Sequence, residues 1–223
     1  MPNVRITPHA AILGTAFRQK WEAIPSKTAA ASPRIDSFST SSTTTNGIEA
    51  CSPSSDGRPV NLAYENGRLS WPSGSARAAV GKAGVRAEKR EGDGATPAGS
   101  FPLLFGMYRS DRAGVPATML PMTPLLERHA WVDDPQDPNY NRLVELPYPA
   151  HAERLWRSDE IYDLLVVVGY NMNPTRPGAG SAIFLHIARP DFSSTEGCVA
   201  VSREVLLRLL PALGTGSTLT IRA

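Results

Sequence analysis

The sequence predicts a mainly β fold with some α-helix (α+β), in which one or two helices pack on strands and a disordered tail precedes the domain. Two uninterrupted apolar runs, at 164–168 and 182–187, are typical of strands that are buried on both faces. Proline and glycine recur densely after residue 57, which favours short strands and loops over long helices. The expected strands and helices do not alternate regularly enough for a parallel β/α fold.

The expected strands differ in their burial pattern. Residues 164–168 read Leu-Leu-Val-Val-Val and residues 182–187 read Ala-Ile-Phe-Leu-His-Ile, so both lack the polar alternation of a solvent-facing strand. The second run contains His186 near its end. The segment 217–222 alternates apolar and polar residues and therefore predicts a last strand with one buried face.

Two short helices are expected. Residues 150–156 are one candidate. The other begins after Ser202, whose hydroxyl suits an N-cap, with Glu204 in the first turn near the positive end of the helix dipole. Pro211 ends this helix. Its apolar stripe consists of Val205, Leu206, Leu209 and Leu210.

The composition of the chain changes near residue 57. Residues 26–56 are rich in serine and threonine, and such a stretch buries too little apolar surface to offset the entropy of ordering it. We therefore expect a disordered Ser/Thr-rich segment over 1–56 and one folded domain over 57–223. Gly14 and Thr15 interrupt the short apolar run near the N-terminus, so a secretory signal peptide is not expected.

Bulk properties exclude several classes of partner. The 223-residue chain is 41% hydrophobic with a net charge of +2, and it has no basic stripe, so no nucleic-acid partner is expected. No apolar stretch is long enough for a membrane span. The two cysteines, Cys51 and Cys198, lie in segments of different character, and no CxxC pair occurs. We expect a monomer without a disulfide framework, a cofactor or a metal ion.

A cysteine and a histidine near the C-terminal end could form a nucleophile–base pair. Cys198 lies in the segment 193–200, between the strand that holds His186 and the helix after Ser202. A thiol requires a partner to become a thiolate near neutral pH. The twelve residues from His186 to Cys198 allow a strand, a turn and a returning strand, which would bring the imidazole within hydrogen-bond reach of the sulfur.

Gly197 lies directly before this cysteine and removes a side chain beside the sulfur, so a substrate can approach closely. The backbone N–H groups of Gly197 and Cys198 could face the oxyanion of a tetrahedral intermediate. A lone cysteine is also commonly a small buried apolar residue, and a lone histidine at a strand end is commonly structural. The residue pattern by itself leaves both interpretations open.

Three ordered motifs resemble the signature of the L,D-transpeptidase family, also called the YkuD-like family. There, a histidine at a strand end is followed by Ser/Thr-His-Gly-Cys, and the matching residues here are His186, Thr195, Gly197 and Cys198. The segment 92–101 resembles the family's Thr-Pro-x-Gly-x-Phe strand entry, and 180–186 resembles the strand that delivers the histidine. The resemblance covers about residues 57–223 and implies an L,D-transpeptidase-like β-sandwich as the catalytic domain.

The resemblance implies a reaction on peptidoglycan stem peptides. The Cys198 thiolate would attack the carbonyl of the third residue of a tetrapeptide stem, D-alanine would leave, and an acyl-enzyme would remain. An amine of a second stem would then take the acyl group and form a cross-link, whereas water as acceptor would make the enzyme a carboxypeptidase. His186 would take the thiol proton and pass a proton to the leaving amine. The cell envelope or periplasm is therefore the expected location.

The segment departs from the family pattern at Glu196, which stands where the family has a second histidine. In an extended segment residues 196 and 198 point to the same face, so a carboxylate there would raise the pKa of the thiol. Glu196 would therefore be turned away, paired, or placed to attract the cationic acceptor amine; a solvated or capping glutamate is the alternative. The spacing from His186 to Cys198 is also shorter than is usual in the family.

Further substrate contacts are expected next to a Pro/Gly-rich loop at 174–180. Tyr170 would stack on the stem peptide beside Asn171, with ordinary packing at a strand end as the alternative. The expected substrate-binding residues are Tyr170, Asn171, Thr195 and Glu196. The acidic segment 131–141 is expected to be an ordered surface loop rather than a calcium site.

Three other functions are compatible with parts of the sequence. A papain-like cell-wall peptidase would place its cysteine before its histidine, which is the reverse of the order here. A non-catalytic wall-binding module could keep the fold without turnover. A metal hydrolase is the third alternative. The sequence has no HExxH pair and no common zinc spacing, but metal ligands could come from His151, His186, Asp191, Glu196 and Cys198.

Overall fold

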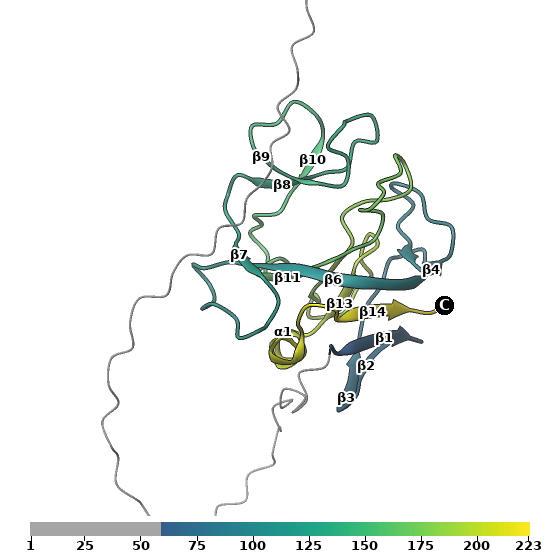
Figure 1. Cartoon of the computed structure of the whole chain (residues 1–223), viewed down its shortest axis with the longest axis vertical. Helices are drawn as coiled ribbons and strands as arrows, with labels where there is room; N and C mark the ends of the chain where they lie inside the picture. Colours follow the sequence, from purple (N-terminus) through teal and green to yellow (C-terminus); the bar gives the residue numbers. More distant parts are fainter. Residues whose placement is uncertain (1–58) are drawn as a thin grey trace, which may run out of the picture. The chain divides into compact units, whose positions relative to one another are not determined.

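The protein, described by a computed structural model over residues 59–223, is built mainly of short strands (Figure 1). The segment expected to be disordered, 1–56, lies outside these residues. The strands are β1 Asn61–Glu65, β2 Arg68–Trp71, β3 Gly74–Arg77, β4 Val85–Arg86, β5 Thr96–Pro97, β6 Gly99–Tyr108, β7 Met122–Pro124, β8 His129–Val132, β9 Leu143–Glu145, β10 Ala152–Arg154, β11 Leu164–Val168, β12 Phe184–Ile187, β13 Val199–Val201 and β14 Thr218–Ile221. The helices are α1 Arg203–Leu209 and the 3₁₀ helix η1 Leu210–Ala212. The expected mainly β fold with a short packed helix is confirmed.

One large sheet is organised around β6, its longest strand. The order of the sheet is β13-β12-β11-β6-β14-β1-β2-β3, and β7 also pairs with β6. Residues 99–102 of β6 pair with β14, whereas residues 103–108 pair with β11, so the strand is shared by two halves of the sheet. Side chains of both halves, such as Leu219 and Leu185, meet in one apolar core. This arrangement is the expected β-sandwich (Figure 1).

One end of the sheet is formed by β1, β2 and β3, and the β1–β2 hairpin is closed by Asn66 and Gly67. Both residues have a positive φ, 48° and 75°, as a two-residue type I′ turn requires. β1 also pairs in parallel with β14, so strands from the two ends of the described residues are neighbours. The strand predicted over 217–222 is confirmed as β14, with Leu219 and Ile221 buried.

The strands β11 and β12 are buried on both faces, as their unbroken apolar runs predict. Val166 and Leu185 point into the larger core, which α1 helps to form. Leu165 and Phe184 point into a second core on the opposite face. Trp131 of the three-stranded sheet β10-β8-β9 closes this second core, and its ring lies edge-on to Phe184 with 5.1 Å between the centroids.

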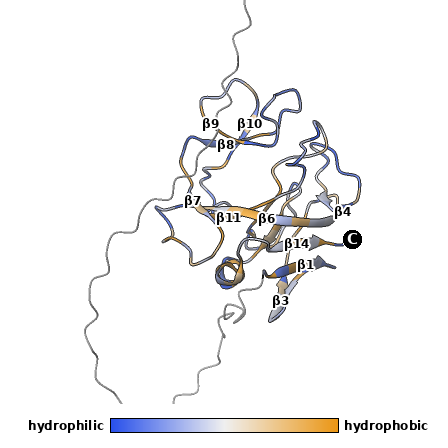
Figure 2. Ribbon diagram, viewed as in Figure 1, coloured by the Kyte–Doolittle hydropathy of each residue, from blue (hydrophilic) through white to orange (hydrophobic). Residues whose placement is uncertain are grey.

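The helix predicted after Ser202 is confirmed as α1. The Ser202 hydroxyl accepts a hydrogen bond from the N–H of Val205 at 3.3 Å, as expected of an N-cap. Leu206 and Leu209 are fully buried, and Figure 2 shows both apolar and polar residues on the helix ribbon. Pro211 lies in η1, where the α-helix has ended. Over residues 59–223, no helix is long and apolar enough to cross a membrane.

The helix predicted over 150–156 is wrong, because the structure has the strand β10 there. β10 pairs antiparallel with β8, with Glu153 opposite Trp131. Alanine, glutamate, arginine and leucine are good helix formers, but an isolated helix of seven residues is marginal in water. Pairing with β8 satisfies the backbone instead, so tertiary structure overrides the local preference.

Candidate active site

Cys198 lies immediately before β13, at the end of the turn formed by residues 195–197. The residue is 7% exposed and belongs to the second core. Its Sγ accepts a hydrogen bond from the N–H of Phe184 at 3.3 Å, and the thiol donates to the carbonyl of Ala182 at 3.2 Å. Backbone groups at the start of β12 therefore fix the sulfur.

His186 lies in β12 and is oriented by its own backbone. Its Nδ1 is 2.9 Å from the carbonyl oxygen of Ile187, and because a carbonyl can only accept, Nδ1 carries the proton. In the neutral ring Nε2 is then unprotonated and can act as a base. The ring of Tyr162 meets the imidazole edge-on, with 5.3 Å between the centroids. The sequence does not identify this orienting oxygen.

The two residues lie on the same face of neighbouring strands. β12 and β13 are parallel, with His186 opposite Ala200, so Cys198 precedes that partner by two residues, or about 7 Å along the strand. The returning strand expected between them is therefore wrong. Residues 188–197 carry the chain back to the start of β12, and neither hydrogen bond of the sulfur involves His186.

The protonation state of Cys198 is set by burial. Burial and then the charge of Glu153 raise the pKa of the thiol to about 12. Three groups act in the opposite direction: the N–H of Phe184, the charge of Lys89 and the hydroxyl of Tyr162. Near neutral pH the resting protein therefore holds a thiol rather than a thiolate.

Burial also favours the neutral form of the histidine. It lowers the pKa of His186 to about 4, although the hydrogen bond to Ile187 opposes the shift. The imidazole is therefore neutral at neutral pH. A neutral base that comes within hydrogen-bond reach of a neutral thiol can accept the thiol proton as the sulfur attacks.

A cavity of about 610 Å³ opens over the pair and has both Cys198 and His186 in its wall. Tyr162 and Glu153 also line it, and the tyrosine hydroxyl donates to Glu153 Oε1 at 2.9 Å. Charged side chains of both signs complete the lining, among them Glu91, Asp133, Arg157 and Arg189. The cavity is thus suited to a ligand that carries both positive and negative groups.

Thr195 and Gly197 shape the turn that carries the sulfur. The buried Thr195 hydroxyl donates to the carbonyl of Cys198 at 2.7 Å and accepts from the N–H of Gly197 at 3.1 Å. Gly197 has a φ of +146°, and a Cβ there would lie 2.9 Å from the carbonyl oxygen of Ala95. No other residue type fits this position without a backbone shift. The N–H of Gly197, expected to face an oxyanion, is bonded to Thr195 instead.

Glu196 lines the cavity but its carboxylate is turned outward. Its side chain is 78% exposed and forms an ion pair with Lys82 Nζ at 2.7 Å. The carboxylate that lies close to the thiol is Glu153, not the one that the sequence singles out. Of the expected arrangements, a paired and outward-facing Glu196 is the one observed.

Tyr170 and Asn171, expected to bind substrate, do not line the cavity. The hydroxyl of Tyr170 donates to the carbonyl of Ala179 at 2.5 Å, and its ring packs edge-on to Phe101. The amide of Asn171 donates to the carbonyl of Gly180 at 2.8 Å. Both side chains stabilise the conformation of the loop at 174–180. This is the ordinary packing at a strand end that is the alternative to substrate binding.

Sequence reasoning missed Tyr162 and Glu153, the two residues of the cavity wall that shift the pKa of the Cys198 thiol. Tyr162 lies two residues before the apolar run at 164–168, and a tyrosine next to a buried strand signals a hydroxyl that needs a buried partner. Glu153 offers no such signal, because its place depends on the pairing of β10 with β8.

The ligand set of a metal hydrolase is not assembled in the part of the chain that the structure describes. There, no group of three or more His, Cys, Asp and Glu side chains is placed to hold a metal ion. His151 pairs with Asp133 at 2.5 Å, on the rim of the cavity. The acidic segment 131–141 uses its carboxylates in turns, as in the bond from the N–H of Asn139 to Asp137.

Two of the solved structures to which the chain is similar are L,D-transpeptidases. L,D-transpeptidase 1 of Mycobacterium tuberculosis is 12% identical with a TM-score of 0.34, and the comparison covers 74% of this chain and 59% of that one. An L,D-transpeptidase from Mycobacterium smegmatis is 14% identical with a TM-score of 0.32 and the same two coverages. The chain thus spans less than two thirds of the length of either protein. No curated protein matches the sequence.

A family model gives the decisive comparison. Residues 56–221 match the model of the YkuD L,D-transpeptidase catalytic domain. The motifs at 92–101, 180–186 and 195–198 all lie within the matched residues, and so does every residue of the cavity wall. The match covers well over half of the chain, and the chain belongs to the YkuD family of L,D-transpeptidase catalytic domains.

Proposed function

We propose that the protein is a cysteine-nucleophile L,D-transpeptidase that acts on peptidoglycan stem peptides and cross-links the cell wall. One observation carries the proposal: Cys198 and His186 lie on one face of neighbouring strands and in the wall of one cavity. Membership of the family supplies the reaction class. The proposed location is the cell envelope, because the substrate lies there.

The reaction begins from two neutral groups. As the sulfur of Cys198 attacks the carbonyl of the third stem residue, its proton passes to Nε2 of His186. The tetrahedral intermediate then collapses, the imidazolium protonates the amine of D-alanine, and a thioester remains on Cys198. The amine of a second stem attacks this thioester and gives up a proton to His186. As the new amide forms, the sulfur of Cys198 leaves and takes this proton from the imidazolium, which restores the thiol.

The charged wall of the cavity supports a peptide substrate with free amino and carboxyl groups. Arg189 lies three residues after His186, and Glu153 accepts the hydroxyl hydrogen bond of Tyr162, whose ring contacts that histidine; all of them line the cavity. Fixed charges of both signs can orient such a peptide before the sulfur attacks, which raises the effective concentration of the reacting groups.

The test is incubation of the full chain with purified tetrapeptide wall fragments, followed by mass spectrometry of products and protein. We expect release of D-alanine, cross-linked dimers and a tripeptide adduct on Cys198. Cys198→Ala removes the nucleophile and His186→Gln removes the base, so both should abolish turnover. Arg128→Gln, in an exposed ion pair outside the cavity, is the matched control and should keep full turnover.

The products distinguish the proposal from its alternatives. Tripeptide monomers without dimers would assign a carboxypeptidase that uses the same thioester. Wild-type protein that binds wall fragments as well as Cys198→Ala does, with neither product nor adduct, would assign a non-catalytic wall-binding module and contradict the proposal.

A further inference from the structure

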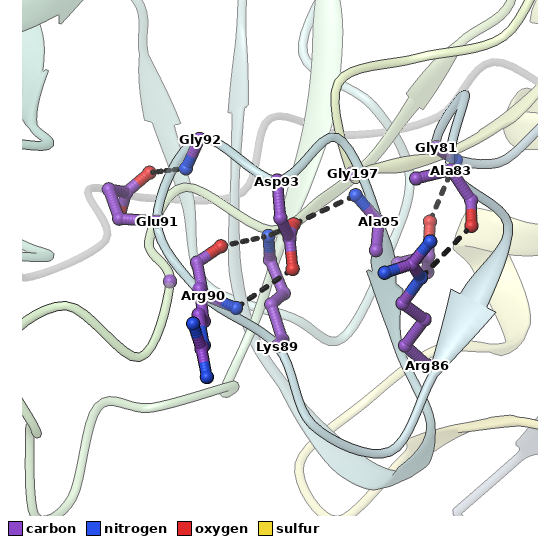
Figure 3. Close-up of polar contacts among 12 residues, drawn as sticks. Gly81, Ala83, Arg86, Lys89, Arg90, Glu91, Gly92, Asp93, Ala95 and Gly197 are labelled. Atoms are coloured by element: carbon purple, nitrogen blue, oxygen red, sulfur yellow. Dashed lines mark hydrogen bonds and ion pairs between the residues drawn. The ribbon is translucent and has the colours of Figure 1, made fainter.

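Lys89 is a buried cation for which the acyl-transfer steps above assign no role. Its side chain is only 3% exposed, although lysine is almost never fully buried unless it is paired. Figure 3 shows its ammonium between the carboxylate of Asp93 and the carbonyl of Arg90, at 2.7 Å and 3.2 Å. Burying such a pair costs solvation energy, so it is weak as a source of stability.

Asp93 fixes the position of this charge. Its carboxylate accepts the N–H groups of Arg90 and Ala95, both at 2.8 Å, in addition to the lysine (Figure 3). Against the opposing effect of burial, the N–H of Arg90 and then Lys89 hold the pKa of Asp93 below its usual range. The ion pair is therefore held by a backbone turn.

The lysine packs behind the turn that carries the sulfur. A Cβ added to Gly197 would lie 3.7 Å from Lys89 Cε, and one added to Gly180 would lie 2.8 Å from the same carbon. The ammonium is one bond further along the side chain. Because Gly197 adjoins Cys198 and Lys89 does not line the cavity, the charge lies behind the cavity wall.

Neighbouring side chains act on the buried sulfur in opposite directions. Glu153 disfavours a thiolate, whereas Lys89 and the neutral hydroxyl of Tyr162 favour it. His186, from the neighbouring strand, is neutral at rest. Among these four groups Lys89 alone is positive before the proton moves, and it opposes the charge of Glu153.

We propose that Lys89 is a positioning residue for this site, whose fixed charge behind the Gly197–Cys198 turn stabilises the negative charge that develops on the sulfur. The inference rests on the proposed function of Cys198 as nucleophile. Because the charge is buried, salt and solvent screen it little, and it acts without contact with the substrate.

Alkylation of Cys198 by iodoacetamide tests the proposal without a wall substrate. Lys89→Met removes the charge and keeps the apolar stem, so the thiol pKa should rise and alkylation at fixed pH should slow about tenfold for each unit of that rise. Lys82→Met is the matched control. It removes the same charge from an exposed ion pair on the same turn, and it should change the rate less than about twofold.

The double variant Lys89→Met/Asp93→Asn replaces the ion pair with neutral groups. Its alkylation should be slower than that of the wild type but faster than that of Lys89→Met, because no unpaired carboxylate remains. Wild-type alkylation rates in a folded variant with a lowered melting temperature would show that Lys89 only fills space, and would overturn the proposal. Failure of both variants to fold would overturn it too, since the pair would then be a requirement of the fold.

Turnover of tetrapeptide fragments is measured in parallel with alkylation. If the wild type has no turnover but Lys89→Met slows alkylation, the proposed function fails and the role of Lys89 stands. If the wild type turns over and Lys89→Met changes neither rate, the proposed function stands and the inference fails.

Discussion

His186 and Cys198 are both neutral at rest, and burial is the cause in each case. A buried pair of this kind has no preformed thiolate that oxidants or unrelated electrophiles could capture. In the proposed reaction, the thiol proton would move to His186 as the sulfur attacks a carbonyl. The groups next to the sulfur then set the free-energy cost of removing the thiol proton.

The pH dependence of thiol reactivity follows from these shifts. Since the pKa of Cys198 is raised to about 12, the thiolate fraction should increase about tenfold per pH unit below that value. We therefore expect the rate of alkylation by iodoacetamide to rise continuously from about pH 6 to about pH 10. A plateau near neutral pH would instead indicate a thiolate–imidazolium pair.

Tyr162 is the neighbour whose removal should be most informative. Tyr162→Phe keeps the ring against His186 but removes the hydroxyl that bonds Glu153 and favours the thiolate. We expect turnover of tetrapeptide fragments to fall about tenfold, with little change in KM, because the lost interaction strengthens as charge develops. Tyr148→Phe, whose hydroxyl bonds Asp137 on the surface, is the control and should retain wild-type kinetics. A larger KM with unchanged kcat would assign Tyr162 to binding.

Single residues were predictable where a motif ties them to backbone geometry. Gly197 and Cys198 follow from the Thr-Glu-Gly-Cys segment, and His186 follows from the strand before it. Tyr162 and Glu153 reach the cavity through long-range strand pairing, which local sequence patterns do not record. Tyr170 lies in an equally suggestive pattern but bonds inward to its own loop.

At the scale of elements, the turn at 195–198 is a rigid unit built by one hydroxyl. Thr195 bonds the residues at two other positions of the turn, and its own N–H and carbonyl bond Val80 and Lys82 of a separate segment. The turn that carries the sulfur is therefore fixed both internally and to the neighbouring segment. Precise placement of a nucleophile matters because small displacements reduce the rate strongly.

Replacement of the Thr195 hydroxyl tests this rigidity. Thr195→Val leaves the buried N–H of Gly197 without an acceptor, so we expect the free energy of unfolding to fall by about 1–3 kcal/mol. Turnover should fall more than stability alone explains, because the turn loses its fixed shape. Thr195→Ser keeps the hydroxyl and should retain most of both properties. Denaturant unfolding and steady-state kinetics check the two effects, and equal losses in both variants would exclude a role for the hydroxyl.

Elements were predictable where local and tertiary preferences agree. The helix α1 has a serine cap, an acidic first turn and buried Leu206 and Leu209, so every signal points the same way. β11 and β12 follow from unbroken apolar runs. The segment at 150–156 has helical preferences but pairs with β8, and its local sequence does not predict this pairing.

At the scale of the molecule, Asp163 ties three parts of the chain together. Its side chain is 2% exposed and bonds Arg112 at 2.9 Å and Arg203 at 2.6 Å. Arg112 follows β6, Arg203 opens α1, and Asp163 directly precedes β11. The carboxylate therefore joins a loop, a helix and the start of β11.

Asp163→Asn should destabilise the whole domain. The substitution leaves two arginines that are partly exposed without their buried counter-ion, so we expect a loss of about 2–3 kcal/mol in the free energy of unfolding. Glu160→Gln removes the exposed carboxylate that also bonds Arg203, and it should cost less than about 0.5 kcal/mol. Denaturant midpoints of both variants check the difference. Similar midpoints would show that burial adds nothing to this ion pair.

The two strands of the candidate site, β12 with His186 and β13 directly after Cys198, have no face toward solvent, and this has a kinetic consequence. Amide protons in β12 can exchange with deuterium only when both apolar cores open, so their exchange should report global unfolding. The turn at 195–198 has an exposed member in Glu196 and should exchange sooner. Formation of a thioester on Cys198 should therefore slow exchange in the turn and leave exchange in β12 unchanged. Deuterium exchange in the turn would then report acylation, with β12 as an internal reference.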